Sequence, residues 1–73
     1  MAKKGSGTVY RVTEVIGTSS NSWEDAARNA VKTAASSLRD LRIAEIEKLD
    51  VKIEDGKITQ FRARLALSFK YDG

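Results

Sequence analysis

The chain has 73 residues, with 13 lysines and arginines against 10 aspartates and glutamates, and it contains neither cysteine nor histidine. A domain of this size buries only about 60% of the surface that its unfolded chain exposes, so it usually needs disulfides, a metal or a partner subunit. The composition excludes disulfides, zinc sites and the commonest general base. A hard cation held by carboxylates is still possible. We therefore expect self-association, and we expect no enzymatic activity.

Residues 1–7 (MAKKGSG) are predicted to form a disordered basic tail, and residues 8–73 a single domain. Lys3 and Lys4 of this tail supply part of the net charge of +3. In the rest of the chain basic and acidic residues alternate, which argues against nucleic-acid binding. No apolar run has the length of a membrane span, and the start lacks a signal-peptide pattern. We expect a cytoplasmic protein without membrane contacts.

The first element is predicted to be a strand over 8–16 (TVYRVTEVI), because this segment is rich in β-branched residues. Its alternation predicts that Tyr10, Val12 and Ile16 form the buried face. Residues 17–21 (GTSSN) are expected to form a loop. A Gly-Thr-Ser loop before a helix could hold an anion, but ordinary helix capping is the better interpretation.

An amphipathic helix is predicted from Ser22 to about Leu38, since small apolar residues recur there at helical spacing. Its buried stripe is mostly alanine, which allows close contact with a sheet. Two pairs have the spacing of an N-terminal cap: Asn21 with Glu24 and Ser22 with Asp25. The helix also has one large side chain near its start, Trp23, which is predicted to pack in the core or in a subunit contact.

Residues 42–71 are predicted to form a long β-hairpin turned at Asp55-Gly56, because Asp-Gly between two strand-like runs favours a type I′ turn. A two-residue turn gives paired residue numbers that sum to 111, which places Glu47 opposite Arg64 and Leu49 opposite Arg62. In this register apolar residues change faces near Glu47, unless a β-bulge there shifts the pairing. The fold class follows: α+β, with β-α-β-β order, in which the third strand lies between the other two and the antiparallel sheet wraps the helix.

The predicted hairpin is much longer than the predicted helix. About 17 helical residues span roughly 26 Å, whereas about 13 strand residues span roughly 43 Å. The half of the hairpin near the turn therefore needs another partner, because an exposed apolar ribbon on two faces would aggregate. Its apolar residues are Leu49, Val51, Ile53, Ile58 and Phe61.

Several short sequence motifs occur together in this chain, in the order strand, loop, helix and hairpin. They are 9–12 (VYRV), 14–19 (EVIGTS), 22–26 (SWEDA), 38–46 (LRDLRIAEI), 54–57 (EDGK) and 67–70 (LSFK). Across residues 8–71 this combination resembles the dodecin family. The resemblance implies a hollow homododecamer that binds or stores a small ligand at subunit interfaces and is not an enzyme. Many dodecins bind flavins, so FMN or riboflavin is the implied cofactor.

The implied flavin site comprises Ile43, Glu45 and Arg62, and it departs from the family at two positions. Flavin-binding members have a stacking tryptophan early in the second strand, where this chain has Ile43. They have a glutamine in the third strand, where this chain has Arg62. The alternative implied by the resemblance is a variant without flavin, acting as a structural or calcium-binding assembly or holding another ligand such as coenzyme A. No spacing among the carboxylates matches a known calcium loop.

Overall fold

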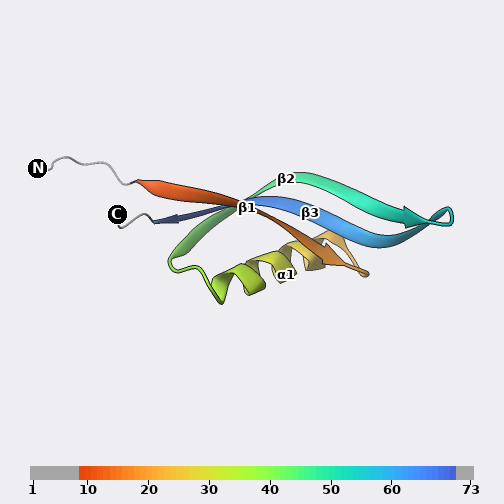
Figure 1. Ribbon diagram of the computed structural model, residues 1–73, viewed down its shortest axis with the longest axis horizontal. Helices are drawn as coiled ribbons and strands as arrows, with labels where there is room; N and C mark the ends of the chain where they lie inside the picture. Colours follow the sequence, from red (N-terminus) through yellow and green to blue (C-terminus); the bar gives the residue numbers. More distant parts are fainter. Residues whose placement is uncertain (1–8, 71–73) are drawn as a thin grey trace, which may run out of the picture.

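The computed structural model describes residues 9–70. Strand β1 spans Tyr10–Ser19, helix α1 spans Trp23–Ala35, and strands β2 and β3 span Leu41–Glu54 and Lys57–Lys70. The three strands form one antiparallel sheet in the order β1-β3-β2. Helix α1 lies against one face, and the β2-β3 hairpin projects beyond its end (Figure 1). The predicted fold class is confirmed, while the predicted tail and Tyr71 lie outside the described residues.

The core lies where α1 meets the middle strand. Ala26, Ala30 and Ala34 recur every four residues along α1 and pack against Leu65 and Leu67 of β3. Alanine side chains keep the helix close to the sheet, as the alanine stripe predicted. The helix ends earlier than expected, at Ala35, because the cap residue that follows it donates its backbone N–H to carbonyls of the last turn.

Strand β1 differs from the prediction in both its length and its buried face. It continues through Gly17, Thr18 and Ser19, which were expected to form a loop but pair with β3. The predicted buried face was also wrong. Val15, Gly17 and Ser19 face the helix, whereas Tyr10, Val12 and Ile16 are exposed. The physical reason is close packing, since a Cβ at position 17 would lie 2.1 Å from the Ala26 carbonyl oxygen.

The hairpin turn is confirmed, with positive φ angles of 53° at Asp55 and 76° at Gly56. The predicted register holds beside the turn and again from Ile43 to Ile46, but it is shifted by one residue between these parts. Glu47 is the extra residue in β2 at one end of the shift, and Thr59 is the extra residue in β3 at the other. The bulge considered from the sequence is therefore present.

The bulge at Glu47 places the apolar residues that follow it in β2 on the helix face. Directly paired residues share a face, and Leu49 pairs with the buried Ala63 while Val51 pairs with Phe61. The two-sided apolar hairpin expected from the sequence was therefore wrong, because it assumed an unbroken register. A helix of 13 residues spans only about 20 Å. Beyond it, Leu49, Ile53 and Ile58 are 49%, 63% and 56% exposed.

Candidate ligand site on the outer face of the sheet

The outer face of the sheet is the face turned away from α1. It carries Arg62, Arg64, Ala66 and Ser68 of β3, because the residues between them face the helix core. Their cross-strand partners lie on the same face. From β1 these partners are Thr18, Ile16, Glu14 and Val12, and from β2 they are Asp50, Lys48, Glu45 and Ile43.

All three residues predicted to hold a ligand lie on this face. Ile43 pairs with Ser68 and is 60% exposed, and the exposed Glu45 pairs with Ala66. Arg62 lies six residues from Ser68 along β3, which corresponds to roughly 20 Å in an extended strand. Within one subunit the structure therefore brings Ile43 and Glu45 together, but it does not bring Arg62 to them.

Arg62 forms a paired ion contact with Asp50 across the two strands. The Arg62 Nε donates to Asp50 Oδ1 at 2.7 Å, and the second guanidinium nitrogen donates to Oδ2 at 3.0 Å. The hydrogen bond from Arg62 lowers the pKa of Asp50 below its usual value, and the same bond raises the pKa of Arg62. The predicted register had placed Leu49 opposite Arg62, so sequence reasoning missed Asp50. The change of face by the apolar residues near Glu47 in the predicted register was the signal that could have revealed this neighbour.

Glu47 does not lie opposite Arg64, as the predicted register had it. Because Glu47 is the bulged residue, Lys48 pairs with Arg64. A hydrogen bond with the Glu14 side chain, followed by desolvation, raises the pKa of Glu47 above 4.5. The negative charges of Glu14 and Glu45 also raise the pKa of Glu47, whereas the positive charge of Arg64 lowers it. Within residues 9–70, no three acidic side chains lie close enough to hold a metal ion.

Trp23 connects the start of α1 to the hairpin. Its Nε1–H donates to the backbone oxygen of Asp50 at 2.9 Å. Its ring packs edge-on against Phe61, with ring centroids 5.2 Å apart and planes inclined by 75°. Trp23 is 39% exposed, so it packs on its own hairpin at the edge of the core. This position fixes the backbone at Asp50 from the helix side of the sheet.

The predicted capping pair of Ser22 and Asp25 is confirmed. Ser22 Oγ accepts the Asp25 N–H at 3.0 Å, which satisfies one of the free donors at the helix start. The Asp25 carboxylate accepts a bond of 2.7 Å from the buried hydroxyl of Ser19. The Ser19 Oγ also accepts the backbone N–H of Asn21 at 2.9 Å. The Gly-Thr-Ser segment thus serves the helix cap, as the preferred interpretation held.

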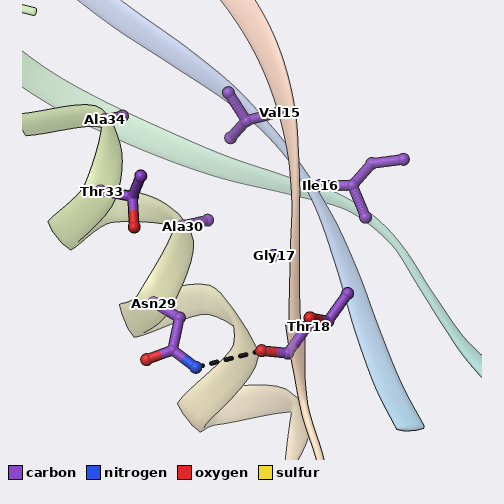
Figure 2. A pocket seen from close by; sticks show the side chains of 8 residues that line it. All are labelled: Val15, Ile16, Gly17, Thr18, Asn29, Ala30, Thr33 and Ala34. Carbon is purple, nitrogen blue, oxygen red and sulfur yellow. Dashed lines mark hydrogen bonds between the residues drawn. The ribbon is translucent and has the colours of Figure 1, made fainter. Parts of the chain in front are cut away.

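A separate groove of about 390 Å³ lies between α1 and the free edge of β1. Figure 2 shows Val15 directed to the helix side of β1 and Ile16 to the other side. The Asn29 side-chain amide closes one end by donating to the Thr18 carbonyl oxygen at 3.0 Å. No side chain that lines this groove is charged, so it offers no counter-charge for an anion.

These features define a small α+β protein in which a three-stranded sheet wraps one helix and leaves its outer face and hairpin tip exposed. The family model for dodecin matches residues 9–72. The chain belongs to the dodecin family. Among the described residues, no helix is both long and apolar enough to cross a membrane.

Individual relatives support the same assignment. The calcium dodecin of Mycobacterium tuberculosis is 45% identical over 64 residues, covering 86% of this chain and 89% of the relative. The dodecin structure from Streptomyces coelicolor is 40% identical, with a TM-score of 0.86 over 93% of this chain and 97% of that chain. A solved M. tuberculosis calcium dodecin is 43% identical, with a TM-score of 0.78 over 88% and 91% of the two chains. Its description names it calcium-chelating, with a novel calcium-binding site.

Proposed function

We propose that this protein is a homo-oligomeric dodecin shell, a homododecamer as the family resemblance implies, that holds a small ligand without catalysing a reaction. The observation that carries self-association is the uncovered apolar surface of the hairpin. Ile53 and Ile58 pair with each other on the helix face and are 63% and 56% exposed. Apolar surface of this kind in a small soluble domain marks an interaction site. A second copy would remove it from water.

Native mass spectrometry tests the assembly. We expect an oligomer for the unchanged protein and a loss of subunits when Ile53→Lys places a charge in the contact. Ser20→Lys adds the same charge at an exposed position outside the hairpin and should leave the assembly intact. A monomeric wild-type protein at micromolar concentration would refute the proposal.

For the ligand, we propose calcium first. The support is the 45% identity to a calcium dodecin over most of both chains. Because no cluster of three acidic side chains occurs within residues 9–70, calcium would need ligands from more than one subunit or from backbone carbonyls and water. Calcium titration of the intact assembly by calorimetry, with magnesium as the control ion, tests this. Equal weak heats for both ions would contradict a calcium site.

A flavin is the second candidate, at Ile43, Glu45 and Arg62, with Arg62 supplied by another subunit because one subunit does not bring it to the other two residues. The observation that favours it is the apolar outer face beside the small Ser68, where Val12 and Ile43 are 61% and 60% exposed. Ile43 offers apolar area but no aromatic face. An aromatic contact adds about 0.5–1.5 kcal/mol, so Ile43→Trp should tighten riboflavin binding by up to about tenfold. Fluorescence quenching measures this, and absence of quenching by both proteins would contradict the flavin proposal.

A further inference from the structure

Asp50 lies within a group of basic side chains on the outer face. Lys48, Asp50 and Lys52 alternate along β2 without a register shift, so all three point to this face. Arg62 lies directly opposite Asp50, and Arg64 lies opposite Lys48. The attraction of Arg62 and Arg64 for the Asp50 carboxylate is visible in its lowered pKa. Asp50 is therefore the acidic residue within a local group of four basic side chains.

The contact with Asp50 occupies one edge of the Arg62 guanidinium that could otherwise bind an external anion. A guanidinium recognises phosphate or carboxylate through two parallel N–H donors on one edge. In Arg62, Nε and a terminal nitrogen both donate to the Asp50 carboxylate, at 2.7 and 3.0 Å. A phosphate group would have to displace this carboxylate or use the remaining terminal N–H donors of a guanidinium whose charge Asp50 already compensates.

We propose that Asp50 is a specificity-determining residue, which occupies one pair of donors of Arg62, compensates its charge and so makes the outer face favour uncharged ligands over phosphate-bearing ones. This inference rests on the proposal that the outer face holds a small ligand. It opposes the simple expectation from the net charge of +3, which would favour anions. Riboflavin and FMN differ only in the phosphate group, so their affinity ratio isolates the effect.

The experiment compares riboflavin and FMN binding to the intact assembly by fluorescence quenching. The wild-type protein should bind riboflavin more tightly than FMN. Asp50→Asn removes the carboxylate charge but keeps the backbone oxygen that accepts the Trp23 bond. It should favour FMN over riboflavin by about tenfold, the factor expected from one charge-assisted hydrogen bond. The double variant Asp50→Asn/Arg62→Gln should lose this preference.

Glu54→Gln is the matched control, because it changes the net charge equally while Glu54 contacts Lys52 and not Arg62. The same FMN preference in Glu54→Gln would show a general charge effect and overturn the proposal. A tenfold preference for FMN in the wild-type protein would also overturn the proposal, and this measurement does not depend on the folding of any variant.

Inorganic phosphate, titrated at constant ionic strength, provides a test that does not depend on flavin binding. If no protein binds flavin but only Asp50→Asn binds phosphate, the flavin proposal fails and the role of Asp50 stands. Equal phosphate binding by Asp50→Asn and wild type would overturn that role.

Discussion

Replacing Gly17 by alanine should destabilise the fold strongly, because β1 and α1 meet there through backbone atoms. An added Cβ would lie 2.1 Å from the Ala26 carbonyl oxygen and 2.7 Å from the Ala30 Cβ. Neither atom belongs to a flexible side chain, so β1 or α1 must move away from its neighbour. Overpacking in a core costs about 1–3 kcal/mol, and we expect the upper end. For a domain of this size, about 3 kcal/mol lowers the melting temperature by roughly 12–24 °C.

Thermal unfolding followed by circular dichroism measures this effect, at equal protein concentration because assembly contributes to stability. Gly56→Ala is the matched control. Its Cβ would meet nothing within 4 Å, although the φ angle of 76° adds strain of about 1–2 kcal/mol. Gly17→Ala/Ala30→Gly should not recover stability, since the contact with the Ala26 oxygen persists. A Gly17→Ala protein at least as stable as Gly56→Ala would refute the close helix–strand contact.

Three further changes test other parts of the structure. Ser22→Ala removes the N-cap acceptor and should lower the free energy of unfolding by about 1 kcal/mol, measured in urea; no change would contradict this cap. Trp23→Phe keeps a ring near the hairpin but removes the hydrogen bond to the Asp50 carbonyl, so it should lower the free energy of unfolding by about 0.5–1.5 kcal/mol. Equal urea midpoints for the variant and the wild type would argue against this bond. Because Glu14 raises the pKa of Glu47 above 4.5, the stability from this group is complete below pH 4.5 and decreases as pH rises through the folded-state pKa. Glu47→Gln cannot ionise, so its stability relative to wild type should increase across that pH range, and a constant difference would contradict the interaction.

The sequence was sufficient for the fold because several local signals agreed. The β-branched residues of β1, the alanine stripe of α1 and the Asp55-Gly56 turn each indicated one element, and their order left one antiparallel arrangement. The buried face of β1 was not predictable in this way. Its alternation favoured Tyr10 and Val12, whereas the close approach of the helix selects the face that contains Gly17. A glycine contributes nothing to a hydrophobic pattern, so tertiary packing decided the face.

The candidate site was predicted only in part, because a shift of one residue in the strand register exchanges the two faces of a strand. Ile43 and Glu45 precede the bulge and keep the predicted pairing, in which paired residue numbers sum to 111. Beyond the bulge, the expected neighbour of Arg62 was Leu49 and the observed neighbour is Asp50. The apolar residues that changed faces in the uninterrupted register were the available sign of a bulge. Their pattern did not show which residue was extra.

The bulge therefore links the fold to the ligand chemistry of the outer face. Without an extra residue at Glu47, Leu49 would oppose Arg62 and the guanidinium would have no carboxylate opposite it. With it, the apolar residues Leu49 and Val51 join the helix side, while Asp50 turns outward and forms two bonds with Arg62. The same shift that gathers apolar side chains on the helix side thus supplies the carboxylate that neutralises the arginine. If Asp50 sets ligand preference, that preference was established by the backbone of β2 as much as by the identity of the side chain.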